Sequence, residues 1–195
     1  MQLRSGVCRG LLASALVAAL AGPASASTFL RASLEDLSAK NSTIVLGEVV
    51  DAVSYWNADH SFILTDVTIA TQETIKGDRK ETYNLTLLGG TVGRRSALIV
   101  DGAELVPGRS YLLFLNVDEL PGSPPALTPR CYSQCVFEIT AKDGELKAIS
   151  QARHAHLLAD KRGVAEAPGG VEGLPLQNLI SELRQLVKRQ EEVAR

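Results

Sequence analysis

Apolar residues between Thr43 and Val117 recur in short runs that turn residues separate. The runs are rich in Ile, Val and Leu, and they end at Gly, Pro, Asn or Asp, a pattern typical of β-strands joined by loops. Lys76-Gly77-Asp78 and Pro107-Gly108 mark two of the turns. We therefore predict five strands, over about 43–54, 61–75, 81–88, 97–100 and 110–117.

The first of these runs is apolar on both faces, whereas a strand with one exposed face alternates apolar and polar residues. A long strand that bends at Gly47 can serve two sides of a small barrel. The pattern therefore predicts a mainly β fold, a five-stranded Greek-key barrel of the OB type. A β-sandwich is the alternative. The apolar residues of this run are Ile44, Leu46 and Val50 on one face and Val45, Val49 and Val53 on the other.

Two helices are predicted at the ends of this β-rich stretch. Leu30, Leu34 and Leu37 have helical spacing, and Ser33 with Asp36 resembles a capping box, so a short helix is expected over about 33–39. A second, amphipathic helix is expected over about 175–193. It either covers the barrel core, which we favour, or binds a partner. Its apolar face consists of Leu176, Leu179, Ile180, Leu183, Leu186 and Val187.

The region between the barrel and the last helix predicts an added hairpin. Residues 132–140 and 145–149 flank the turn sequence Lys142-Asp143-Gly144. The segment before it, 120–130, holds four prolines and predicts a loop. The segment after it, 167–173, is rich in glycine and predicts a linker.

The first 26 residues have the features of a secretory signal peptide. Arg4 and Arg9 form a positive start, and an apolar run over 11–21 is too short to span a membrane. Ala24-Ser25-Ala26 is the small-residue pattern of a cleavage site. An uncleaved N-terminal anchor is the alternative. We expect one domain over 27–195, located in the periplasm or outside the cell.

The charge balance bears on the kind of partner. The 195-residue chain has a formal net charge of −2. Removal of 1–26 takes away two arginines and no acidic residue, which leaves 18 basic and 22 acidic side chains and a net charge of −4. Proteins that bind nucleic acids usually carry a basic face, so a nucleic-acid partner is not expected. No second apolar segment is long enough for a membrane span, so the mature chain is expected to lack a stable anchor.

Cys131 and Cys135 remain after this cleavage. In an oxidising compartment a close cysteine pair is expected to form a disulfide. Free thiols and a metal site are the alternatives, although C-x-x-x-C alone is a weak metal signal.

No residue pattern predicts a reaction or a cofactor. The sequence contains no H-E-x-x-H, G-x-S-x-G or S-x-x-K motif. His60, His154 and His156 are not spaced with the cysteines as zinc ligands are, and surface positions are the simpler interpretation. A hydrolase that uses His60, Ser61 or the His154/His156 pair is the enzymatic alternative to a binding protein. Ligand binding in the barrel mouth is a third hypothesis.

Two loops carry candidate partner-binding residues. Tyr55, Trp56 and His60 belong to a polar loop after the first strand, and Trp56 either anchors a partner or packs under the barrel rim. Arg94 and Arg95 follow a run of glycines. That run is interpreted as a strand connection, with an anion site formed by backbone amides as the alternative.

Several segments together resemble a group of bacterial secreted proteins. They are A-K-N-S-T-I-V-L-G-E-V-V-D-A, T-D-V-T-I-A-T-Q-E-T-I-K-G, L-L-G-G-T-V-G and V-P-G-R-S-Y-L-L-F-L. Residues 132–137, Y-S-Q-C-V-F, resemble the S-Q-G-x-F strand of that group, with Cys135 in place of glycine. Proteins of this group have a netrin-like OB-barrel core similar to the tissue inhibitors of metalloproteinases, and some occur beside matrixin-type metalloproteases.

The resemblance implies a non-enzymatic, protein-binding module, and it makes an extracellular metalloprotease the first partner to test. Tissue inhibitors chelate the protease zinc through an N-terminal cysteine. Here the expected mature end is Ser27-Thr28-Phe29, without a cysteine, so no residue of that mechanism maps onto this chain.

Cleavage after Ala26 is a direct test of the export hypothesis. Mass spectrometry of the exported protein should give a chain that starts at Ser27, because Ala24-Ser25-Ala26 meets the requirement of signal peptidase for small residues. Intact protein that starts at Met1 in the membrane fraction would contradict this.

Overall fold

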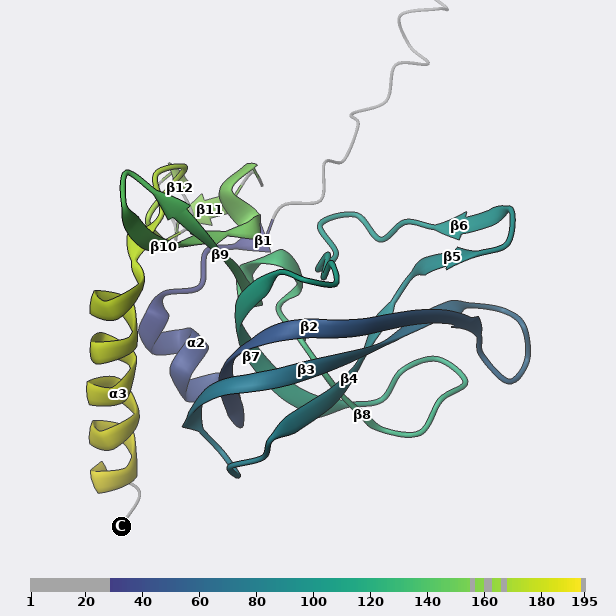
Figure 1. Ribbon diagram of the computed structural model, residues 1–195, viewed down its shortest axis with the longest axis horizontal. Coiled ribbons are helices and arrows are strands. Elements are labelled where there is room, and N and C mark those ends of the chain that lie inside the picture. The colour runs from purple at the N-terminus through teal and green to yellow at the C-terminus, as the bar shows by residue number, and fades with distance from the viewer. Residues whose placement is uncertain (1–28, 155–156, 160–162, 166–167, 194–195) are drawn as a thin grey trace, which may run out of the picture.

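The computed structural model describes residues 29–154, 157–159, 163–165 and 168–193 (Figure 1). The predicted signal peptide, 1–26, lies outside this range. The helices are α2 (Leu34–Lys40), η1 (Tyr132–Cys135), η2 (Gln151–His154) and α3 (Leu176–Val193), where η1 and η2 are short 3₁₀ helices. The strands are β1 (Phe29–Leu30), β2 (Thr43–Trp56), β3 (Ile63–Lys76), β4 (Thr82–Leu88), β5 (Gly90–Val92), β6 (Arg95–Ala97), β7 (Ser110–Asp118), β8 (Ala126–Thr128), β9 (Val136–Lys142), β10 (Glu145–Ser150), β11 (Leu157–Ala159), β12 (Gly163–Ala165) and β13 (Leu174–Pro175).

One antiparallel sheet dominates the fold. Its strands follow the order β13-β10-β9-β7-β2-β3-β4, and β8 pairs with the end of β7. Within the described residues, no backbone pairing joins β4 to another strand besides β3, so hydrogen bonds do not close the sheet. The prediction of a mainly β fold is confirmed.

The prediction that β2 buries both faces is confirmed for its first half. Ile44 and Leu46 belong to a core cluster shared with α3, while Val45 and Val49 belong to a second cluster on the other side of the sheet. The second half differs, because Val50 and Val53 are 52% and 53% exposed. A register shift between Val49 and Asp51 changes the alternation there, and the paired segment of β7 stops at Glu48.

Both predicted helices are present. The Ser33 hydroxyl accepts a hydrogen bond from the Asp36 backbone N–H, and the Asp36 carboxylate accepts one from the Ser33 backbone N–H, which completes the capping box of α2. The buried face of α3 consists of the six residues that the periodicity predicted. None of the helices in the described part of the chain combines the length and the hydropathy of a membrane span.

The predicted fourth strand, over 97–100, is wrong. The chain instead forms the β5–β6 hairpin, whose second strand ends at Ala97. Gly93, which has a φ of 60°, and Arg94 form its turn. Residues 98–101 leave this hairpin without strand pairing, and Leu98 is 92% exposed. Apolar side chains alone therefore did not identify the strand.

The added hairpin is confirmed, with a shift at its start. β9 and β10 pair through a turn in which Asp143 and Gly144 have φ values of 54° and 78°, the left-handed values of a tight hairpin turn. Residues 132–135, predicted as strand, form η1 instead. The predicted loop over 120–130 contains the short strand β8.

Helices α2 and α3 lie at the end of the molecule opposite to the β2–β3 loop and the β5–β6 tip. In Figure 1, α2 and α3 lie on the left, whereas the tip of β5–β6 and the loop between β2 and β3 lie on the right. The outer half of the β2–β3 ladder therefore extends away from the helix-covered core, and it carries the predicted binding loop.

Replacement of Leu183 by alanine tests the helix-covered core. Leu183 is 0% exposed and packs in the cluster beneath α3. We expect Leu183→Ala to lower the free energy of unfolding by about 2–5 kcal/mol, because it leaves a cavity. Denaturant unfolding measures this, and Gln185→Ala, on the exposed face of α3, is the matched control. Equal stability of the two variants would contradict the packing described.

Candidate functional site

Two hairpin tips, distant in sequence, meet around Trp56. The Trp56 and His60 rings are stacked, with centroids 6.2 Å apart and an interplanar angle of 27°. The Arg95 guanidinium carbon lies 6.0 Å from the centroid of the Trp56 ring, which is cation–π geometry. We call these three residues the tryptophan cluster. They bring together three of the five residues predicted to bind a partner.

Tyr55 does not join the tryptophan cluster. Successive side chains of a strand point to opposite faces, and the Tyr55 hydroxyl donates to Asp66 Oδ1 at 3.1 Å. Thr86 donates to the same oxygen at 2.7 Å. Burial, with a smaller contribution from the Asp66 carboxylate, raises the pKa of the Tyr55 hydroxyl. Tyr55 therefore supports the hairpin from the face opposite Trp56.

Arg94 and Arg95 provide positive charge beside the tryptophan ring. Both residues are exposed at the tip of the β5–β6 hairpin. Among the described residues, no carboxylate forms an ion pair with either guanidinium. The tip therefore presents two uncompensated positive charges next to a partly exposed indole.

Asn57, which the sequence analysis did not single out, organises the loop between β2 and β3. Its side chain is 2% exposed, and its Oδ1 accepts from the backbone N–H groups of Ser61 and Phe62, both at 2.9 Å. Its Nδ2 donates to the Ser61 hydroxyl at 3.1 Å and to the Pro121 carbonyl at 3.0 Å. An asparagine after a strand is typical of a local turn, but no sequence signal indicates a partner 64 residues away.

His60 and Ser61 have structural contacts within this loop. The His60 ring lies against Trp56, and its φ of 56° places the backbone in the left-handed region. The Ser61 hydroxyl donates to Asp59 Oδ1 at 2.6 Å, and this hydrogen bond lowers the pKa of the Asp59 carboxyl group. These contacts give the hydrolase hypothesis no support at His60 and Ser61. His156 and the side chain of His154, the other residues of that hypothesis, lie outside the described part.

A chain of hydrogen bonds holds β5 against the β2–β3 hairpin. The Thr91 backbone N–H donates to Ser54 Oγ at 3.3 Å, Ser54 and Thr65 share a hydrogen bond of 2.8 Å, and Thr65 Oγ1 donates to the Gly89 carbonyl at 2.7 Å. A side chain at Gly90 would collide with the Ser54 and Thr65 hydroxyls. We call this set the hydroxyl clasp. It fixes the β5–β6 hairpin on the ladder that carries Trp56.

Cys131 and Cys135 lie at disulfide distance, with Cα atoms 5.2 Å apart, as predicted. Cys131 precedes η1 and Cys135 is its last residue. The pair lies apart from the tryptophan cluster, because Cys131 packs against the helix-covered core. In the part of the chain that the structure describes, no group of three or more His, Cys, Asp or Glu side chains could hold a metal ion.

Comparison with known proteins adds no assignment, since neither a protein-family model nor a curated protein matches this chain.

Asn57→Ala tests whether the loop depends on this one amide. The change removes four side-chain hydrogen bonds of a buried amide, so we expect the free energy of unfolding to fall by about 1–3 kcal/mol. Trp56 is the only tryptophan of the chain, so its fluorescence should also shift to longer wavelength as the loop loosens. Asn178→Ala, on the exposed surface of α3, is the control. Unchanged stability and emission would mean that Asn57 does not organise the loop.

Proposed function

We propose that this chain is a secreted, non-enzymatic protein-binding module with a netrin-like, OB-type core, and that the tryptophan cluster is its binding surface. An extracellular metalloprotease is the first partner to test. The observation that carries the proposal is the meeting of Trp56, His60 and Arg95 from two hairpins at one exposed end of the molecule.

The order of the strands supports the OB-type core. In an OB barrel the first strand pairs with the second and the fourth, and the fifth lies near the third. Here β2 pairs with β3 and β7, and β8 lies beside β4. This agreement supports the proposed OB-type core, and among the described residues the backbone groups of β4 and β8 do not pair.

The composition of the surface supports a protein partner. Trp and Arg are enriched among the residues that contribute most to protein–protein binding. The Trp56 ring is partly exposed between two side chains that are themselves exposed. An indole in this position adds apolar contact area at low entropic cost, because the neighbouring rings and the loop already restrict it.

The charge of the surface indicates the chemistry of the partner. Arg94 and Arg95 have no acidic partner among the described residues. An acidic patch on the partner would complement them and would accelerate association at low ionic strength. The proposed partner is therefore a secreted protein with an acidic surface.

Trp56→Ala is the principal test. The exported wild-type protein is used to capture its partner from the culture supernatant, and the purified partner is then titrated with both forms. We expect affinity to fall by about 1–3 kcal/mol, as for an interface anchor. Thermal stability should change little, because Trp56 is only half-buried. A large stability loss, or unchanged affinity at unchanged stability, would remove the tryptophan cluster from the binding surface.

The paired variant Arg94→Ala/Arg95→Ala separates charge from contact area in the same titration. It should lower affinity and also reduce the dependence of affinity on salt. Arg79→Ala is the matched control, since Arg79 is exposed in the turn between β3 and β4. An equal effect of Arg79→Ala would show that only the overall charge matters.

A further inference from the structure

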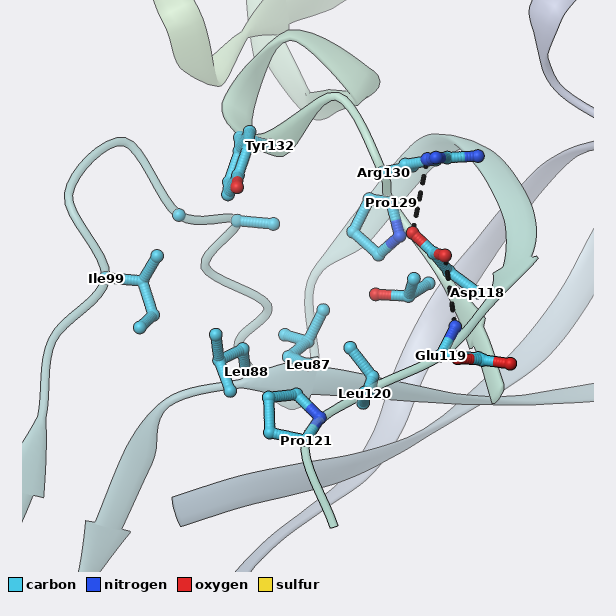
Figure 2. Close-up of a pocket in the computed structure, with 13 residues that line it drawn as sticks. Leu87, Leu88, Ile99, Asp118, Glu119, Leu120, Pro121, Pro129, Arg130 and Tyr132 are labelled. Atoms are coloured by element: carbon cyan, nitrogen blue, oxygen red, sulfur yellow. Dashed lines mark hydrogen bonds and ion pairs between the residues drawn. The ribbon is translucent and has the colours of Figure 1, made fainter. Parts of the chain in front are cut away.

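A small hollow lies between the end of β4 and the segments that flank β8 (Figure 2). Its volume is about 220 Å³. Pockets for small molecules and cofactors usually measure about 300–1,000 Å³. The hollow therefore suits a single side chain better than a whole ligand molecule.

Most of the lining is apolar. Leu87, Leu88, Leu120 and Pro121 lie together on one side of the hollow, and Tyr132 lies on the opposite side (Figure 2). Tyr132 is 44% exposed and has a φ of 53°, a left-handed conformation that is rare for an aromatic residue. Strained backbone of this kind is concentrated at functional sites.

Thr128 adds a polar group to this lining. The residue is 7% exposed, and among the described residues nothing forms a hydrogen bond with its hydroxyl. Because the Thr128 hydroxyl lines the hollow, a ligand that supplies a hydrogen-bond donor can take the place of solvent there.

The rim of the hollow carries an excess of negative charge. Asp118 Oδ2 lies 3.2 Å from Arg130 Nε, and Asp118 Oδ1 accepts from the Glu119 backbone N–H at 3.0 Å. The Glu119 carboxylate is exposed and forms no ion pair with a described residue. Two carboxylates and one guanidinium leave one negative charge uncompensated.

We propose that this hollow receives an arginine side chain of a partner protein. The apolar stem of arginine matches the leucine side, and its planar guanidinium can stack on Tyr132. The same group donates hydrogen bonds without accepting any, which suits the Thr128 hydroxyl and the Asp118 and Glu119 carboxylates. An apolar side chain would leave the hydroxyl and the rim charge unmatched.

The hollow adjoins the tryptophan cluster through one loop. Pro121, which lines the hollow, accepts a hydrogen bond from Asn57, and Asn57 directly follows Trp56. That an arginine side chain fits the hollow does not depend on the proposed function. That this arginine belongs to a partner protein rests on the proposed protein-binding function. A partner that covers both sites would offer acidic groups to Arg94 and Arg95 and an arginine to the hollow.

The test uses a blocked amino acid as the probe, so it does not require the natural partner. The exported protein, labelled with ¹⁵N, is titrated with N-acetyl-arginine methylamide and followed by NMR, with the norleucine analogue as the apolar control. The arginine probe should shift the backbone signals of Thr128 and Tyr132, and the norleucine probe should bind at least about tenfold more weakly, since it lacks the charge-assisted hydrogen bonds.

Variants locate the binding in the hollow. Asp118→Asn/Glu119→Gln should weaken the arginine probe about tenfold, and Thr128→Val, which keeps the shape, about threefold. Glu192→Gln, at the exposed end of α3, is the matched control and should have no effect. Equal binding of norleucine, or binding that ignores both sets of variants, would overturn the assignment.

Two further comparisons settle the source of the arginine and its relation to the proposed function. Unblocked arginine should bind no more tightly than the blocked probe, because the hollow is proposed to take the side chain alone. Tighter binding would show that the α-ammonium and α-carboxylate groups are recognised, which would indicate a free metabolite and overturn a protein source. Trp56→Ala should leave the arginine probe unaffected. If the probe fails to bind while Trp56→Ala still weakens the partner, only the arginine inference is wrong.

Discussion

The pairing of β2 with β3 is the interaction on which the other parts of the structure depend. Each strand is 14 residues long, and three register shifts bend the ladder that they form. β7 pairs only with residues 43–48 of β2, so the remaining half of the ladder extends past the centre of the sheet. The β2–β3 loop forms the end of this extension, and the β5–β6 hairpin is hydrogen-bonded to it.

The inner half of the ladder is stiff because it is packed on both sides. The cluster that contains Ile44 lies beneath α3, and the cluster that contains Val45 lies on the other face, where Tyr83 and Tyr111 are buried. Burial raises the pKa of the Tyr111 hydroxyl, which accepts a hydrogen bond from the Val106 backbone at 3.1 Å. A base held in this way can position loops without large entropic loss on binding.

The sequence correctly predicted those elements that depend on residues close together in the chain. The capping box at Ser33, the apolar face of α3 and the turn at Asp143-Gly144 each depend on residues within a few positions of one another. Strand limits for β2, β3, β4 and β7 were also predicted within about two residues, since their apolar runs end at turn residues. The predicted strand over 97–100 is absent because Leu98 is exposed, and a pattern of apolar residues does not report whether they are buried.

The candidate site could be predicted only in part, because it depends on contacts between distant segments. The sequence predicts Trp56 and Arg95 as binding residues on two separate loops. Only the folded chain shows that the hydroxyl clasp holds their hairpins together. Asn57 and Thr128 were missed, since an asparagine in a loop and a threonine in a short strand are common in sequences. Asn57 is important because it is buried and bonds a residue 64 positions away. Thr128 is important because it lines the hollow and no described residue forms a hydrogen bond with its hydroxyl. Both are properties of the fold.

The same contacts place one loop between the two proposed recognition sites. Asn57 closes the loop that places His60 against Trp56, and it also holds the Pro121 carbonyl beside the hollow. One buried amide therefore contacts both the loop that carries His60 and the segment that lines the hollow. Because buried hydrogen bonds of this kind are costly to leave unmade, displacement of the loop at either site would also disturb the other. The two proposed sites are thus joined by one local hydrogen-bond network.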